Sequence, residues 1–226
     1  MGGTIKHRAG AGALFAFLAA FPAATYGQAH AHMAFTATQP GTATDTARAL
    51  EVVRKLRAAT AQYQTLEDAE AAGYMPRQRA DKVKPNGVLH VGHVRNRGER
   101  PRPLDLSEPQ VLLYRRAADG SMRLAGVMLV APRDATGADL DAVIPRSVAP
   151  WHRHVNVCGT VEDGMIRRFP GITTAEACSA AGGRFRAETR YMIHVMTTAG
   201  DDLAAIFPQG HGMEGMEGMQ AGMGEP

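Results

Sequence analysis

The stretch WHRHVNVC spans residues 151 to 158 and begins with the only tryptophan of the chain. Its polar and apolar side chains alternate, which predicts a strand, because successive side chains of a strand point to opposite faces. One predicted face carries His152, His154, Asn156 and Cys158, and the other carries Trp151, Arg153, Val155 and Val157. The stretch can be either one side of a metal site or the polar side of an ordinary strand.

Other segments supply partners for this strand. Strand-like runs rich in β-branched and aliphatic residues occur at VLHVGHV (88–94), QVLLYRR (110–116), MRLAGVMLVAP (122–132) and RFRAETRYMIHVM (184–196). Three prolines between the first two runs exclude a central strand there. Residues 74–87 are basic and rich in turn formers, so we expect a loop.

Helices are predicted mainly before these strands. In residues 45–64 apolar side chains recur at three- and four-residue spacing, which is typical of an amphipathic helix. Thr65 and Asp68 form a capping-box pattern for a second helix that ends near Gly73. Thr173 and Glu176 form another such pattern for a short helix. Helices followed by strands predict an α+β fold in which N-terminal helices precede a mainly antiparallel sheet.

The first 31 residues have the order of a secretory signal peptide. Basic residues precede about sixteen apolar or small residues broken by Gly12 and Pro22, which is short for a membrane span. Cleavage after Ala29 or Ala31 would leave His30 or His32 at the amino terminus. We therefore expect a periplasmic or secreted protein with no stable membrane insertion after cleavage. The remaining chain divides into a polar lead (32–44), a single domain (45–208) and a tail (209–226).

Charge gives no argument for nucleic acid. Without Lys6 and Arg8, the 25 basic residues fall to 23, against 22 acidic ones. A chain so close to neutrality has no strong electrostatic attraction for a phosphate backbone. Protein partners remain open.

The chain has two cysteines, Cys158 and Cys178. In an exported protein such a pair favours a disulfide. The alternative is that Cys158 is a thiolate metal ligand.

Histidines point to a metal. Residues two apart on a strand point the same way, so His152 and His154 can bind one ion. Met192, His194 and Met196 likewise share a face of the last strand. His90 and His93 are three apart, so only one of them should reach the site. Histidine and methionine together favour copper, with zinc as the alternative, and His30 or His32 at a free amino terminus could form a further copper site.

The tail HGMEGMEGMQAGMGEP places methionines at spacings of three, three and four among glycines. Such a sequence predicts disorder, and exposed thioethers favour Cu(I). The candidate ligands of the tail are His211, Met213, Met216, Met219 and Met223. This segment resembles the Met-rich segments of periplasmic copper-resistance proteins, although it could also be only a solubilising tail.

Residues 66–210 resemble a family of uncharacterised exported bacterial proteins. The resemblance rests on GVLHVGHVRN, LDLSEPQVLLYRR, WHRH, YMIHVM and IFPQG. The chain departs from the family pattern where Glu108 precedes Pro109, where Met196 replaces a tryptophan, and where AIFPQG replaces the closing signature. The resemblance implies a similar fold and no particular activity.

Together these patterns predict an exported copper-binding or copper-homeostasis protein. A metal-dependent enzyme and an exported structural domain with scaffold histidines are the alternatives. No catalytic residues are predicted, because neither a nucleophile elbow nor a phosphate loop occurs in the sequence.

Overall fold

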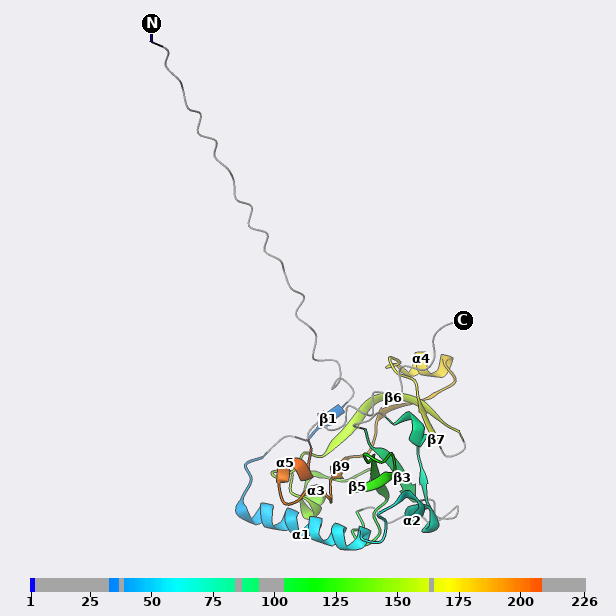
Figure 1. The fold of residues 1–226 in the computed structure, drawn as a ribbon. Helices are drawn as coiled ribbons and strands as arrows, with labels where there is room; N and C mark the ends of the chain where they lie inside the picture. Colours follow the sequence, from blue (N-terminus) through cyan, green and yellow to red (C-terminus); the bar gives the residue numbers. More distant parts are fainter. Residues whose placement is uncertain (3–32, 37–38, 84–86, 94–103, 163–164, 209–226) are drawn as a thin grey trace.

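The computed structural model of the chain describes residues 1–2, 33–36, 39–83, 87–93, 104–162 and 165–208. In this part the fold is α+β, with five α-helices and a mainly antiparallel sheet of nine strands (Figure 1). The strands are β1 (Met33–Phe35), β2 (Tyr74–Pro76), β3 (Leu89–His93), β4 (Val111–Arg116), β5 (Met122–Val130), β6 (His152–Glu162), β7 (Met165–Arg168), β8 (Arg184–Glu188) and β9 (Met192–Val195). The helices are α1 (Ala43–Thr60), α2 (Leu66–Ala71), α3 (Gly137–Val143), α4 (Ala175–Ala180) and α5 (Leu203–Ile206), with a 3₁₀ turn at Ala80–Lys82.

Strand β6, which contains WHRHVNVC, organises the sheet. The strand order is β1-β6-β9-β5-β4-β3-β2, and β7 and β8 also pair with β6. The backbone N–H of Ile166 in β7 donates to the carbonyl of Arg77, just after β2, at 3.0 Å. The two ends of the sheet therefore meet, and the sheet curls around one of its faces.

The two faces of the sheet have different environments. Its outer face carries Val91, Leu112, Val127 and Ile193, which belong to the main apolar core together with Val53 and Leu56 of α1. Figure 1 shows α1 lying along this side of the sheet, whereas α4 lies at the far end beside β6. The inner face carries a smaller apolar cluster of Leu113, Ala125 and Met196. His90 of β3, His152 and His154 of β6, and His194 of β9 lie on the inner face.

The helix starts follow the capping chemistry expected of them. The Thr65–Asp68 box caps α2, and Gly73 ends that segment with a φ of +85°. The short helix α4 is capped by Thr174, so the predicted cap at Thr173 is wrong by one residue. Helix α3, which was not predicted, starts with a third capping box, Thr136 with Asp139.

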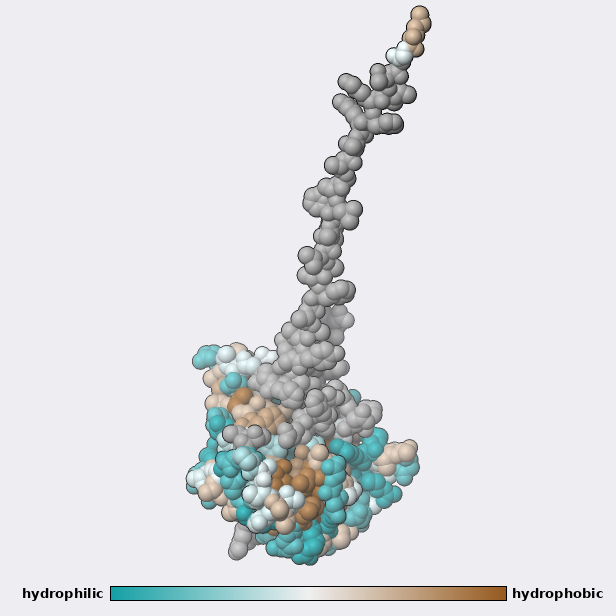
Figure 2. All heavy atoms as spheres, turned by 90° about the vertical axis from the view of Figure 1, so that its left-hand side faces the viewer, coloured by the Kyte–Doolittle hydropathy of each residue, from teal (hydrophilic) through white to brown (hydrophobic). Residues whose placement is uncertain are grey.

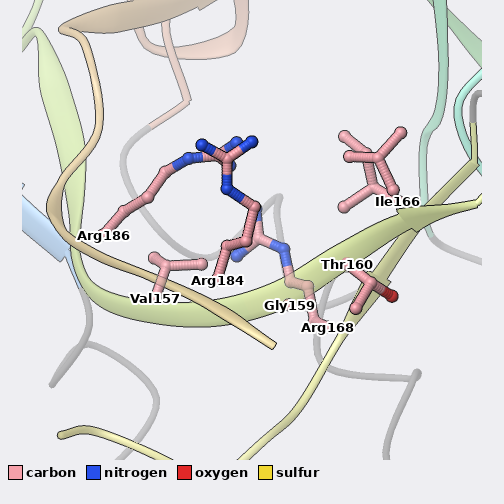
Figure 3. Close-up of a pocket in the computed structure, with 8 residues that line it drawn as sticks. Val157, Gly159, Thr160, Ile166, Arg168, Arg184 and Arg186 are labelled. Atoms are coloured by element: carbon pink, nitrogen blue, oxygen red, sulfur yellow. The ribbon is translucent and has the colours of Figure 1, made fainter. Parts of the chain in front are cut away.

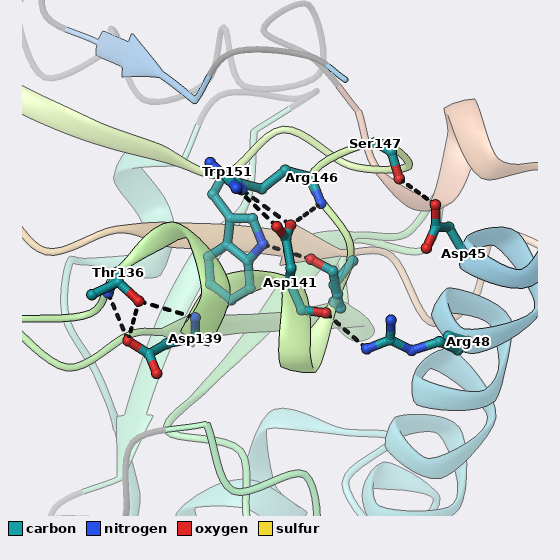
Figure 4. A network of polar contacts seen from close by, with 9 residues as sticks. Asp45, Arg48, Thr136, Asp139, Asp141, Arg146, Ser147 and Trp151 are labelled. Atoms are coloured by element: carbon teal, nitrogen blue, oxygen red, sulfur yellow. Dashed lines mark hydrogen bonds and ion pairs between the residues drawn. The ribbon is translucent and has the colours of Figure 1, made fainter. Parts of the chain in front are cut away.

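Helix α3 is tied to the start of β6. The indole N–H of Trp151 donates to the carbonyl of Ile144 at 3.0 Å, and Trp151 is fully buried. Asp141 pairs with Arg146 at 2.8 Å, and Arg48 of α1 donates to the carbonyl of Asp141 at 2.9 Å (Figure 4). These contacts fix the position at which the chain enters β6, the strand that carries His152 and His154.

Several sequence-based expectations need correction. The polar lead contributes strand β1, and α1 starts within it at Ala43. The expected loop at 74–87 contains β2 and a 3₁₀ turn in its described part. The last strand, expected as one, is divided into β8 and β9. Strand β8 pairs only with β6, whereas β9 pairs with both β6 and β5. In each case a short strand depends on its neighbours more than on its own composition.

The surface of the described part carries both hydrophilic and hydrophobic side chains. On the face shown in Figure 2, hydrophobic side chains gather in small patches among hydrophilic ones. Among the described helices, none has both the length and the apolar character needed to cross a membrane.

Candidate metal centre

Four histidine rings from three strands meet on the inner face of the sheet. The His152 ring centroid lies 5.3 Å from that of His194 and 5.8 Å from that of His154. The ring of His90 lies 5.6 Å from that of His194. We call His90, His152, His154 and His194 the histidine cluster.

The neighbours of β6 hold its two histidines in place. Strand β1 runs antiparallel beside them, with Met33 opposite His154 and Phe35 opposite His152. The Phe35 ring lies 5.7 Å from the His152 ring. The backbone N–H of His154 donates to the hydroxyl of Thr189 at 2.9 Å. His152 and His154 therefore point to the same face of β6, as the alternation of side chains predicted.

The predicted alternation ends at Asn156. This residue has a φ of +51°, in the left-handed region that non-glycine residues rarely adopt, and its side chain is exposed. Asn156 therefore does not share the environment of the two histidines. Cys158 is buried in a disulfide with Cys178, which confirms the predicted bridge and excludes the thiolate-ligand alternative in this form.

Three of the four histidines are shielded from water, and His90 is half-buried. His152, His154 and His194 are 3%, 5% and 5% exposed. Burial lowers the pKa of His152 to about 4, and it lowers the pKa of His194 well below its usual range, aided by the neighbouring histidines. Burial and the charge of Arg168 lower the pKa of His90 to about 4. Near neutral pH these rings are neutral, which is the form that binds metals.

Ring nitrogens converge at one point of the cluster. Nε2 of His90 lies 3.3 Å from Nε2 of His194. The backbone of Val88 beside the His90 ring partly opposes the lowering of its pKa. Nδ1 of His194 and Nε2 of His152 are buried and have no hydrogen-bond partner among the residues that the structure describes.

The nitrogen spacing matches one edge of a metal site. Two nitrogens bound to a tetrahedral ion at about 2.0–2.1 Å lie about 3.3–3.4 Å apart. The same contact is within the range of a long hydrogen bond between the two rings. However, no group of three or more His, Cys, Asp or Glu side chains within the described ranges is already arranged to hold a metal. A third imidazole ligand would therefore come from His152 or His154 after rotation of its ring.

Thioethers border the cluster. Met192 lies opposite His152 in the β6–β9 pair, and Met128 of β5 lies opposite His194. Directly opposed residues of antiparallel strands have Cβ atoms about 5 Å apart. Met196 is on the same face but packs in the apolar cluster with Leu113 and Ala125. Met192 and Met128 each lie directly opposite a histidine of the cluster and are the candidates for a sulfur ligand, although Met128 also packs against the apolar cluster.

His93 lies away from the cluster. Its ring makes an edge contact with Tyr74 at 4.7 Å, and its Nε2 lies 3.5 Å from a carboxylate oxygen of Glu108. His90 and His93 thus point to opposite faces of β3, as a three-residue separation requires. The other candidate ligands, His30, His32, His211, Met213, Met216, Met219 and Met223, lie outside the described residues.

Sequence reasoning missed two residues near the cluster. Met128 was not considered because β5 contains no histidine that would mark its inner face. Arg168 of β7 acts on the pKa of His90 although 78 positions separate the two residues in the sequence. No periodicity reports such a contact, because it depends on the closing of the sheet.

The fold and the site thus define a disulfide-linked α+β protein with a histidine cluster inside a curled sheet. Searches of protein-family models, of curated proteins and of solved structures find no match to the chain. Its function has to be argued from the cluster itself.

Proposed function

We propose that the chain is an exported metal-binding protein whose histidine cluster binds one copper ion. The observation that carries the proposal is the 3.3 Å separation of Nε2 of His90 from Nε2 of His194, two residues on strands that are not neighbours. The buried nitrogens of His152 and His194 that lack partners in the described part of the chain support it. Burying such groups costs free energy, which a bound ion would offset.

The ligand chemistry favours copper over harder cations. The cluster offers neutral imidazoles, with Met192 and Met128 beside them. Magnesium and calcium prefer oxygen ligands, whereas imidazole and thioether suit copper. Zinc would also accept three or four imidazoles, so metal preference is part of the test.

Export is part of the same proposal. The Cys158–Cys178 disulfide fits an oxidising compartment, and the first 31 residues have the order of a signal peptide. The chain would then meet copper outside the cytoplasm. Met33, which directly follows His32 in the sequence, lies opposite His154 of β6.

The experiment uses a chain truncated after Gln209 and blocked at its amino terminus, so that the tail and the amine do not contribute. Copper is titrated as Cu(I) and as Cu(II), and binding is followed by calorimetry and by native mass spectrometry. Trp151 is the only tryptophan and directly precedes His152, so its fluorescence gives a local signal for Cu(II). We expect one tight site.

Matched variants locate the ion. His194→Gln and the double change His152→Gln/His154→Gln should abolish tight binding, whereas His93→Gln should retain it because His93 lies away from the cluster. Unchanged affinity in His194→Gln would refute the site. Preferential binding of zinc would keep the ligands and move the function towards hydrolysis or structural stabilisation. Cluster variants that unfold without metal would identify the histidines as scaffold.

A further inference from the structure

Three arginines from β7 and β8 lie beside the second half of β6. In the β6–β7 pair Arg168 is opposite Gly159, and in the β6–β8 pair Arg184 is opposite the same glycine. Arg186, two residues after Arg184 in β8, lies opposite Val157. Directly opposed residues of a sheet share a face, so Arg168 and Arg184 flank a position that has no side chain.

The three side chains surround a pocket. It has a volume of about 120 Å³ and is lined by Val157, Gly159, Thr160, Val161, Ile166, Arg168, Arg184 and Arg186. Figure 3 shows the guanidinium groups of Arg184 and Arg186 close together, with that of Arg168 directed towards the same space. One water needs about 10–15 Å³ by this measure, so the pocket has room for a small polyatomic ion.

No carboxylate neutralises these charges within the described residues. Other arginines of the chain have acidic partners, such as Arg54 with Glu51 and Arg146 with Asp141. The carboxylate nearest in sequence to Arg186 is Glu188, and it pairs with Arg153. The pocket lining contains three cations and no acid.

This convergence of like charge is costly without a counter-ion. Arg168 is partly buried, and burial together with the charge of Arg186 lowers its pKa. Three guanidinium groups directed at one small volume repel each other more strongly as water is excluded. An anion in the pocket would convert this repulsion into attraction.

We propose that Arg168, Arg184 and Arg186 bind a small tetrahedral oxyanion, with a phosphate group as the preferred ligand. Guanidinium groups bind oxyanions through two parallel N–H···O bonds, and three of them suit a dianion better than a monoanion. Val157 and Gly159 form the floor on which the anion would rest. The pocket contains no histidine, so its anion is bound by other side chains than the copper ion, although the charge of Arg168 also acts on His90.

The test uses the full chain, treated with a chelator so that no metal is present. Inorganic phosphate, sulfate, a phosphate monoester and acetate are titrated separately by calorimetry at fixed ionic strength. We expect saturable binding of phosphate and sulfate and much weaker binding of acetate. Binding of phosphate without the monoester identifies a free anion as the ligand, and binding of both identifies a phosphate group of a larger molecule.

Variants connect binding to the pocket. The double change Arg184→Gln/Arg186→Gln should weaken phosphate binding at least about tenfold per guanidinium removed. Both side chains are exposed, so the fold should be retained, which thermal unfolding checks. The control Arg115→Gln/Arg133→Gln removes the same charge from exposed positions outside the pocket and should bind normally. Equal losses in both double variants, equal binding of acetate, or no phosphate binding by the unaltered chain would each overturn the proposal.

Discussion

Nε2 of His90 lies 3.3 Å from Nε2 of His194 although strands β4 and β5 stand between their strands in the sheet. Neighbouring strands are about 4.8 Å apart, so a flat sheet would hold these rings well out of contact. The sheet brings them together by curling around its inner face. On that face Leu113 of β4 lies opposite His90, and Gly126 of β5 lies opposite Leu113. The cluster is thus a product of sheet curvature.

Gly126 of β5 permits this curvature. A Cβ at this position would lie 2.2 Å from the carbonyl oxygen of Val195 and 2.8 Å from Cα of Met196. Both are backbone atoms of the β9 region and cannot rotate away. We expect Gly126→Ala to lower the free energy of unfolding by about 1–3 kcal/mol and to weaken copper binding, as measured by urea unfolding and calorimetry.

A glycine in helix α3 provides the control. The three atoms nearest to a Cβ at Gly137 belong to the guanidinium of Arg146, a flexible side chain that can shift at some cost to its pair with Asp141. Gly137→Ala should therefore lower stability less than Gly126→Ala. If Gly126→Ala is equally mild, the close approach of β5 and β9 does not constrain the fold.

Protonation of His152 should destabilise the metal-free protein. Its pKa is about 4 in the folded chain and about 6.5 in an unfolded one. Above pH 6.5 the ring is neutral in both states. As the pH falls from 6.5 to 4, the unfolded state binds a proton that the folded state does not, so stability declines and then levels off. The loss from this ring alone is about 3 kcal/mol.

Urea unfolding of the chelated protein between pH 7.5 and 4 measures this loss. His194, whose pKa is also lowered, should add to it. Replacing His152 with Asn should reduce the slope between pH 6.5 and 4 by about one proton. A free energy of unfolding that stays constant over this range would mean that the rings are hydrated in solution.

The disulfide should stabilise the fold and leave the histidine cluster intact. It joins Cys158 in β6 to Cys178 in α4 across 20 positions. On the chain-entropy estimate, a loop of this length contributes about 3 kcal/mol. We expect Cys158→Ser/Cys178→Ser to lower the unfolding free energy by about that amount with copper binding retained. Alkylation of the native protein without reductant should label no thiol, and labelling of two would contradict the pairing.

The tail should bind metal without supporting the fold. Its ligands, His211 and four methionines, stand among glycines that offer little apolar area to bury. Truncation after Gln209 should leave the melting temperature unchanged and reduce the number of Cu(I) ions bound. Unchanged stoichiometry would make the tail a spacer.

Local signals in the sequence predicted much of the fold. The Thr65–Asp68 box, the β4 and β5 runs and the cysteine pair depend on nearby residues or on chemistry that does not need a partner strand. Strands β1, β2 and β7 have three or four residues, and so few positions carry no readable period. They form because neighbouring strands offer hydrogen-bond partners.

The site was predictable in part for the same reason. The two-residue period placed His152 and His154 on one face, and the three-residue separation of His90 and His93 placed only one of them there. The identity of that one depended on which face of β3 is covered by α1, which the sequence did not reveal. The arginine pocket was missed because Arg168 and Arg184 become neighbours only through their common partner Gly159.

Trp151 should affect both the stability of the core and the position of β6, the strand that carries His152 and His154. It is fully buried, donates to the carbonyl of Ile144 at the end of α3, and directly precedes His152. Trp151→Phe leaves that buried carbonyl without its donor and a smaller ring in its place, so we expect a loss of at least about 1–3 kcal/mol in unfolding free energy. Tyr74→Phe is a matched control, because it removes a buried hydrogen bond to the carbonyl of Pro109 at 2.8 Å on the distant strand β2. Both variants should be less stable, but only Trp151→Phe should also weaken copper binding, since only Trp151 fixes the start of β6. If both variants bind copper like the unaltered chain, the position of His152 is set by β1 and β9 alone.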